Sequence, residues 1–296
     1  MSLFLSLFRA RHAGLLYLVV AAIGWGLNWP AMKVLLGEWP PFFARGTAGV
    51  TAALGLALIA RMSGERLAVP RRAVAPLVAA AMTNVFAWMG FSTLSLLWLK
   101  VQEAALLVFT MPIWAMLLAW PFRGERPTAR SLAALALGLA GLGVLFGGQE
   151  VGIGTDKLPG VLCALGAAIL FALGTVSARA PLAIPPLAAV AWQVGIGCLP
   201  MVAAGLLFEK PDLDALSPTG WALMAYMTVV PMALSYLCWF AALRRLPPAT
   251  ASIGTLLTPV IGVVTAAITL GEPFGAKEIL ALCLTLGGVA LALRKT

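Results

Sequence analysis

Long apolar stretches separated by short charged breaks limit what this chain can fold into. Ten of them can be marked off, each near the roughly 20 residues of helix that cross a bilayer. They lie at residues 14–36, 40–60, 73–97, 102–122, 128–147, 158–180, 184–207, 217–243, 248–270 and 275–293. The strands of a membrane β-barrel would alternate apolar and polar residues, and these stretches do not. The sequence therefore predicts an all-α membrane protein with ten transmembrane helices.

Composition argues for a membrane environment and against several other classes of function. Only 10% of the 296 residues are charged, whereas about a quarter is usual in soluble domains. The net charge of +9 could suggest a nucleic-acid partner. Because no basic stripe with interleaved aromatic residues is present, we expect no nucleic acid to bind. The four cysteines lie singly within apolar stretches and the chain has one histidine. We therefore expect no metal site and no cofactor.

The basic residues are divided unequally between the two sides of the membrane that ten spans define. If both termini share a side, that side has fourteen basic and two acidic residues, and the other side has six basic and nine acidic ones. Basic residues accumulate on the cytoplasmic side of membrane proteins. We therefore expect cytoplasmic N- and C-termini. No small-residue cleavage site follows the first long span, so we expect this helix to be retained.

The chain resembles itself at a shift of 147 residues. The aligned pairs include Pro112 with Pro259, Gly124-Glu125 with Gly271-Glu272, and Gly141 with Gly288. Eleven identities fall in the 44 positions from 102 to 145. The repeats, 1–150 and 151–296, would each hold five helices, and this odd number makes the second enter the membrane from the opposite side. We predict two inverted five-helix repeats around a central cavity, an architecture typical of carriers. The alternative is a duplication that only stabilises a helix bundle.

Several motifs resemble those of a known carrier family. The segment from Ala22 to Lys33, AIGWGLNWPAMK, looks like the WGxN…K pattern in the first helix of EamA-type carriers of the drug/metabolite transporter superfamily. Pro40-Pro41 followed by Arg45 resembles the start of their second helix, and the residues before Pro112 and Pro259 are similar to their fourth and ninth helices. The resemblance covers nearly the whole chain. In length and tryptophan content the sequence is most like the aromatic amino-acid exporters of the YddG type.

This resemblance implies a multi-pass transporter of the bacterial inner membrane that exports small metabolites, in particular aromatic or other neutral amino acids, by alternating access. It implies no enzyme activity, and the sequence shows neither a nucleophile with a base nor a phosphate-binding loop. One alternative is a multidrug or quaternary-ammonium exporter of the same superfamily. Another is a structural or partner-binding membrane protein. The expected partners are a small-molecule substrate and the lipid bilayer. The oligomeric state stays open, and a monomer is compatible with the sequence.

Polar and aromatic residues within apolar helices are costly and usually face the interior of a bundle. In the first span Trp25, Trp29 and Lys33 recur every four residues and so share a face. From such patterns in five spans we predict the substrate-binding residues Trp25, Asn28, Lys33, Asn84, Trp88, Ser92, Thr110, Trp114, Ser235, Tyr236, Trp239 and Thr255. The alternatives are core packing for the aromatic residues and bonds to their own helices for the hydroxyls. We expect interfacial anchors at Trp29, Trp39, Trp98, Trp120 and Trp221.

Two charges and four prolines suggest how a carrier of this kind works. Lys33 lies near the outer side and Arg179 at the repeat-related place near the inner side, so we hypothesise matched electrostatic entrances for a substrate carboxylate. The alternative is that both side chains snorkel to the interface. Because proline removes a backbone donor, we also expect kinks or breaks within four spans. The prolines concerned are Pro30, Pro112, Pro231 and Pro259.

The acidic residues bear on energy coupling. Proton-driven carriers place an ionisable group well inside the membrane, whereas all eleven acidic residues here lie in loops or at span ends, with Glu103 the nearest to a span interior. The sequence predicts facilitated export without an obligatory buried proton site. It also favours zwitterionic substrates over quaternary-ammonium cations, which would need a deep acid.

Overall fold

The computed structural model describes residues 2–147, 155–178, 182–246, 250 and 254–293. Every regular element within these ranges is helical, so the predicted all-α class is confirmed. Nine helical segments of the described residues are long and apolar enough to cross a membrane. They run His12–Leu35, Pro41–Met62, Arg71–Ser95, Val101–Arg123, Ala129–Phe146, Thr155–Ser177, Pro186–Glu209, Pro218–Leu243 and Ala276–Leu293.

These segments agree with nine of the ten predicted spans, and no boundary differs by more than three residues. The remaining predicted span, 248–270, falls partly on residues outside the described ranges. Its described part contains a shorter apolar helix, Leu257–Leu270. Ten membrane crossings therefore stay a prediction.

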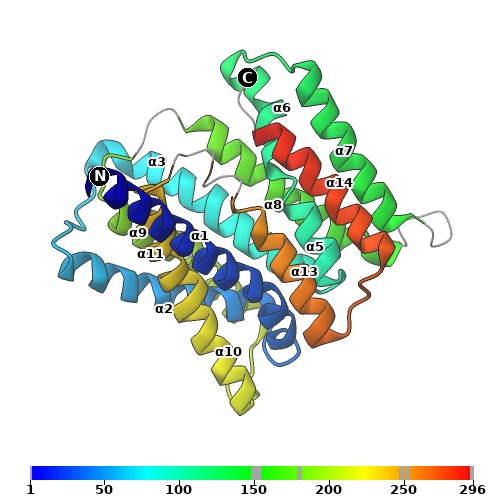
Figure 1. Ribbon diagram of the computed structural model, residues 1–296. Coiled ribbons are helices and arrows are strands. Elements are labelled where there is room, and N and C mark those ends of the chain that lie inside the picture. The colour runs from blue at the N-terminus through cyan, green and yellow to red at the C-terminus, as the bar shows by residue number, and fades with distance from the viewer. Residues whose placement is uncertain (1, 148–154, 179–181, 247–249, 251–253, 294–296) are drawn as a thin grey trace.

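Several segments consist of more than one helical element (Figure 1). The elements of the N-terminal half are α1 (Ser2–Leu35), α2 (Pro41–Met62), α3 (Arg71–Ala81), η1 (Met82–Gly90), α4 (Phe91–Ser95), α5 (Val101–Val108), α6 (Met111–Arg123) and α7 (Ala129–Phe146). Those of the C-terminal half are η2 (Thr155–Lys157), α8 (Leu158–Ser177), α9 (Pro186–Ala204), η3 (Gly205–Glu209), α10 (Pro218–Val229), η4 (Val230–Leu234), α11 (Ser235–Leu243), α13 (Leu257–Leu270) and α14 (Ala276–Leu293). The elements η1, η3 and η4 are π-helical, and η2 is a 3₁₀ turn.

Three of the four prolines lie where a helix changes. Pro112 is in the first turn of α6, after a turn that interrupts the fourth span, and Pro259 is in the first turn of α13. Proline suits these places because the first-turn donors of a helix have no intrahelical partner. Pro231 lies in the π-helical turn η4. Helix α1 continues through Pro30 without a break, packed against α11 and α13, and neighbouring helices make such prolines tolerable. A kink at Pro30 stays a prediction.

The two halves of the chain are interleaved. Helix α1 packs against α11 and α13, whereas α8 packs against η1, α4 and α6. The two most extensive helix pairs, α2 with α9 and α7 with α14, also join opposite halves. Figure 1 shows α7 and α14 side by side at one edge of the molecule, with α2 at the opposite edge. Each half therefore buries its helices mainly against the other half.

Helices α2 and α9 run antiparallel and cap each other. The carboxylate of Glu65, just after α2, accepts a hydrogen bond from the backbone N–H of Ala188 in the first turn of α9, at 3.0 Å. Glu209, at the end of η3, accepts bonds from the N–H groups of Phe42 and Phe43 in the first turn of α2, at 3.0 and 2.9 Å. Carboxylates stabilise helix N-termini because they satisfy free donors and oppose the helix dipole.

Helices α7 and α14 approach each other closely at glycines. A Cβ atom on Gly141 would overlap the backbone of Ala281 and the side chain of Thr285. A Cβ atom on Gly288 would overlap the backbone of Ala134 and of Gly138 on the other helix. Small residues at such contacts let two helix backbones pack tightly within a membrane.

Candidate functional site

A cavity of about 640 Å³ lies between the two halves of the chain. Residues of α1, α2, η1, α4, α6, α8, η4, α11, α13 and α14 line it. This volume lies within the range of pockets that hold small organic molecules, roughly 300–1,000 Å³. The interleaving of the halves thus creates a chamber that both halves line.

Aromatic side chains form one wall of the cavity where α1 meets η4 and α11. The ring centroids of Trp25 and Tyr236 are 5.5 Å apart in an edge-on arrangement, and those of Trp25 and Trp239 are 5.8 Å apart. The indole N–H of Trp25 donates to the carbonyl oxygen of Pro231 at 2.9 Å, which satisfies a polar group that would be costly to bury unpaired. This bond orients the Trp25 ring in the wall.

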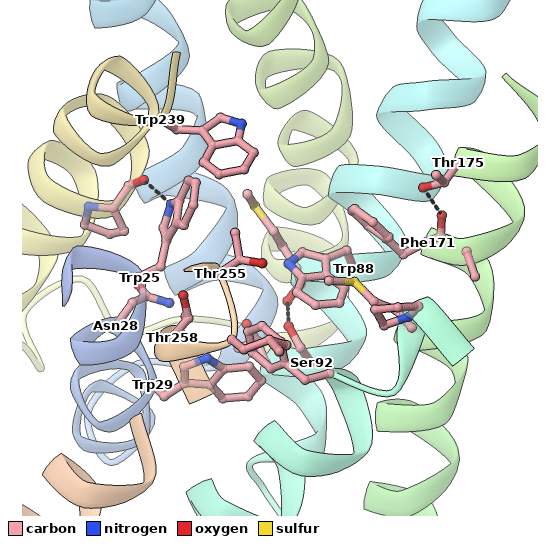
Figure 2. Close-up of a pocket in the computed structure, with 18 of the residues that line it drawn as sticks. Trp25, Asn28, Trp29, Trp88, Ser92, Phe171, Thr175, Trp239, Thr255 and Thr258 are labelled. Carbon is pink, nitrogen blue, oxygen red and sulfur yellow. Dashed lines mark hydrogen bonds between the residues drawn. The ribbon is translucent and has the colours of Figure 1, made fainter. Parts of the chain in front are cut away.

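A second aromatic cluster faces the first across the cavity. Trp88 of η1 packs on Phe171 of α8, with ring centroids 4.9 Å apart, and on Phe109, at 6.0 Å. Trp29 of α1 extends the cluster, 6.3 Å from Phe109. Figure 2 shows Trp25 and Trp239 on one side of the view and Trp88 and Phe171 on the other. Flat or apolar groups could therefore be held between ring faces.

Few polar groups interrupt these walls. The hydroxyls of Ser92 and Thr175 donate to carbonyls of their own helices, those of Met89 at 3.2 Å and Phe171 at 2.9 Å (Figure 2). The hydroxyl of Thr258 is buried and has no hydrogen-bond partner. The residue lines the cavity, but its hydroxyl oxygen is itself covered by protein.

Arg45 is the single charged residue among the described residues that line the cavity. Its side chain comes from α2 and is buried, and its Nη1 donates to Oδ1 of Asn28 on α1 at 3.2 Å. The cavity therefore combines aromatic walls with one cation.

The structure brings seven of the twelve sequence-predicted site residues into this cavity. They are Trp25, Asn28, Trp88, Ser92, Tyr236, Trp239 and Thr255. The other five do not line it; they are Lys33, Asn84, Thr110, Trp114 and Ser235. Four of the five span faces predicted for the site thus keep at least one residue in the lining, and only the face of the fourth span, with Thr110 and Trp114, keeps none.

The five residues outside the lining have structural contacts instead. The indole of Trp114 donates to Thr110 at 3.0 Å, and Thr110 donates to a carbonyl of its own helix. Asn84 accepts a bond from Thr83 and lies where α8 passes closely at Gly174. Ser235 is fully buried where α1 approaches at a glycine. These side chains pack helices together next to the chamber.

Lys33 does not line the cavity, and its side chain bonds to the backbone instead. Its ammonium donates to the carbonyl oxygens of Leu96 and Leu99, at the turn that follows α4. A cation is favourable at this place because the last carbonyls of a helix carry partial negative charge. Arg179, its hypothesised counterpart on the inner side, lies outside the described residues.

Several residues of the lining were not predicted from the sequence. Trp29, expected as an interfacial anchor, is instead 8% exposed and lines the cavity. Its spacing of four residues from Trp25 was a usable signal, and so was the alignment of Phe171 with Trp25 at a shift of 146. Phe109 and the methionines of the lining carried no comparable signal, because large apolar residues occur throughout these helices.

The buried acidic residue nearest to a span interior is already neutralised. Glu103 is 6% exposed and forms an ion pair with Lys157 at 2.6 Å, while its other oxygen accepts a bond from the backbone N–H of Lys100. It does not line the cavity, and neither does any other described carboxylate. Within the described ranges there is also no cluster of side chains that could hold a metal ion.

Comparison with known proteins places the chain among transporters. The profile of the EamA-like transporter family matches residues 12–147 and 158–294. A protein of Salmonella typhimurium described as a probable amino-acid metabolite efflux pump is 26% identical, over 95% of this chain and 94% of that protein. The aromatic amino acid exporter YddG of Ancylobacter novellus is also 26% identical, over 86% and 88% of the two chains. A crystal structure with 20% identity shares the fold, with a TM-score of 0.68 over 95% of this chain and 96% of that one.

Proposed function

This chain belongs to the EamA-like transporter family, and we propose that it exports amino acids or closely related metabolites across the cell membrane by alternating access. The observation that carries the proposal is the chamber of about 640 Å³ between the halves, with two facing aromatic clusters and one cation. Apolar walls with a few placed polar groups are typical of small-molecule sites. Similar chains include proteins described as amino-acid efflux pumps and exporters.

We infer that the seven predicted residues in the lining contact the substrate, together with Trp29, Arg45, Phe109 and Phe171. The five predicted residues outside the lining would support these walls from behind. A quaternary-ammonium or other cationic substrate is disfavoured, because the described lining offers it no carboxylate and presents the Arg45 cation. Aromatic walls alone would suit such a cation, so charge separates the two candidate substrate classes.

Alternating access in this proposal relies on two inverted five-helix repeats, residues 1–150 and 151–296, with ten membrane crossings in all. Contacts that exchange between the halves support it. Gly141 meets Ala281, and Gly288 meets Ala134. Because 288 is 141 plus 147 and 281 is 134 plus 147, the shift of the repeat turns one contact into the other. Glu65 and Glu209, which are 144 residues apart, each cap a helix of the opposite half. Such symmetry lets two halves exchange conformations, so that an inward-open state mirrors an outward-open one.

Orientation follows from the excess of basic residues on the side of the termini, which we take as cytoplasmic. The cavity extends toward that side, because its lining includes Leu293, the last residue of α14, and Thr175, near the end of α8. On the opposite side, Lys33 joins α1 to the turn after α4. We infer that this conformation is open to the cytoplasm.

Coupling to a proton gradient is not required in this proposal. Uphill proton-driven carriers need an ionisable group in the membrane that is free to titrate. The described lining contains no carboxylate, and Glu103 is held by Lys157. Export would then follow the substrate's own gradient.

Transport by the purified protein in liposomes tests the proposal. Proteoliposomes would be loaded with a panel of labelled amino acids and quaternary-ammonium compounds, and efflux followed with and without an imposed pH gradient. We expect saturable efflux of aromatic or other neutral amino acids at a final level that the pH gradient does not change. Absence of flux for every compound would indicate a structural membrane protein, and flux of the ammonium compounds alone would indicate the alternative exporter.

A further inference from the structure

Arg45 is a buried cation without an anionic partner. Arg45 lies in the second turn of α2 and is 7% exposed. Nη1 donates to Asn28, and Nε has no hydrogen-bond partner. The single ion pair found among the described residues joins Lys157 and Glu103, so no described carboxylate neutralises the guanidinium.

Such an arrangement is unfavourable unless an anion completes it. A guanidinium stays protonated in proteins, so deprotonation cannot relieve the cost. A charge removed from water needs hydrogen bonds and a counter-charge to offset its lost solvation. Ionisable residues inside membrane spans are accordingly rare, and they mark substrate or ion pathways.

The position of Arg45 indicates where the missing anion would bind. Arg45 lines the cavity together with Asn28 and Thr258. Because the Asn28 side-chain oxygen accepts from Arg45, its amide N–H groups stay available, while the hydroxyl of Thr258 is buried without a partner. Arg45 and Asn28 thus supply donors where they line the chamber. A carboxylate matches this set, because a guanidinium fork binds its two oxygens with charge-assisted bonds.

The same chamber offers an ammonium group no equivalent site. The described residues of the lining include no carboxylate. Lys33, which the sequence suggested as an entrance for the substrate carboxylate, instead donates to two backbone carbonyls. A substrate ammonium would meet aromatic ring faces and hydroxyls. Ring faces attract cations only modestly, so the amino group of a substrate would contribute little to recognition.

We propose that Arg45 binds the carboxylate of the exported molecule, and that the chamber requires this carboxylate but not an amino group. The inference rests on the export function proposed above and names its substrate class. That class is small monocarboxylates with an apolar or aromatic side chain, with or without an α-amino group.

Three compounds that share one ring separate the two charged groups. Phenylalanine carries both groups, 3-phenylpropionate lacks the ammonium, and 2-phenylethylamine lacks the carboxylate. In proteoliposomes of the full chain, unlabelled 3-phenylpropionate is expected to compete with the efflux of labelled phenylalanine as well as unlabelled phenylalanine does. The amine is expected not to compete, and competition by the amine equal to that of the acid overturns the inference.

Substitution of Arg45 provides a second test. In Arg45→Gln the KM for phenylalanine is expected to rise about ten- to hundredfold, the loss of a hydrogen bond to a charged group, and preference for the acid over the amine should disappear. Arg45→Lys keeps the charge without the fork and should lie in between. Arg61, exposed in the last turn of the same helix, supplies the control Arg61→Gln, with unchanged KM.

The outcomes distinguish the two proposals. If no amino acid of the panel leaves wild-type vesicles, the export function itself fails. If wild type exports phenylalanine and Arg45→Gln does so with the same KM and the same preference, export stands and the role of Arg45 is overturned. Size-exclusion chromatography establishes that each variant folds. Should Arg45→Gln fail to fold, Arg45→Lys and the competition by the three compounds decide the question.

Discussion

Gly141 of α7 and Gly288 of α14 occupy equivalent places in one helix pair, 147 residues apart in the chain. Each glycine meets the partner helix at small residues, and the residues it meets correspond under the same shift. The contact between these helices is therefore built twice from related sequence. Its closeness depends on the absence of a side chain at both positions.

We expect Gly141→Leu and Gly288→Leu each to destabilise the protein, because the added side chain must force apart two backbones. Overpacking of this kind costs about 1–3 kcal/mol or more. Thermal unfolding in detergent, followed by size-exclusion chromatography, measures the effect. Gly143 and Gly287 lie on the same helices with open space around them, so Gly143→Leu and Gly287→Leu should be tolerated. Equal losses in all four variants would show that close packing is not the cause.

Removing a cap that one half supplies to the other should weaken the fold. Glu209→Ala leaves two backbone donors, those of Phe42 and Phe43, without their partner. Loss of a cap of this kind costs ~1 kcal/mol, so we expect a lower unfolding temperature. Glu125 is exposed, and Glu125→Ala is the matched control. A control variant as unstable as Glu209→Ala would refute the capping role.

The aromatic walls should determine affinity for apolar side chains. Trp88, which packs on Phe171 and Phe109, supplies a ring on which an aromatic substrate would stack. An aromatic pair is worth about 0.5–1.5 kcal/mol beyond its buried area, and Trp88→Ala removes it. We expect the KM for phenylalanine to rise about tenfold and that for alanine to change little. Trp120, 54% exposed, provides the control Trp120→Ala. An equal rise for both substrates would argue against stacking in the chamber.

Lys33 is expected to stabilise the protein without contacting the substrate. Lys33→Met removes the donor to the carbonyls of Leu96 and Leu99, and a favourable cation at a helix C-terminus contributes about 0.3–1 kcal/mol. We therefore expect a small loss of thermal stability and an unchanged KM for phenylalanine. A rise in KM comparable to that of Arg45→Gln would instead support Lys33 as an entrance for the carboxylate.

Transport should not depend on the titration of Glu103. Because this residue pairs with Lys157 outside the cavity lining, Glu103→Gln is expected to export phenylalanine to the same final level, whether or not a pH gradient is imposed. Wild-type proteoliposomes that accumulate substrate against its gradient when protons flow, and a Glu103→Gln variant that cannot, would overturn gradient-driven export.

Much of the fold could be predicted because the signals are local. The hydropathy of nine described spans marked their ends to within three residues. Pro112, Pro231 and Pro259 correctly marked places where a helix changes. Pro30 did not, because the effect of a proline within a membrane helix depends on the helices that pack around it.

The site was predictable only in part, because each residue of a helix pattern points to a face but not to what that face meets. Trp25 and Trp88 line the cavity, whereas Trp114 does not line it and donates a hydrogen bond to Thr110. Trp29 was misplaced for the opposite reason: its distance from the end of the predicted span suggested the interface, yet α1 is covered there by neighbouring helices.

The sequence by itself determined a helical membrane protein of the transporter class. The solvation of apolar runs and of charges depends on local composition, and repeated motifs can be read directly along the chain. Only the tertiary structure decided which side chains face the chamber. It selected Arg45, one of twenty basic residues, as the cation of the lining and assigned Lys33 to backbone carbonyls. The reason is physical: burial and partnership of a charge depend on helices that lie far apart in sequence and meet only when the two halves interleave.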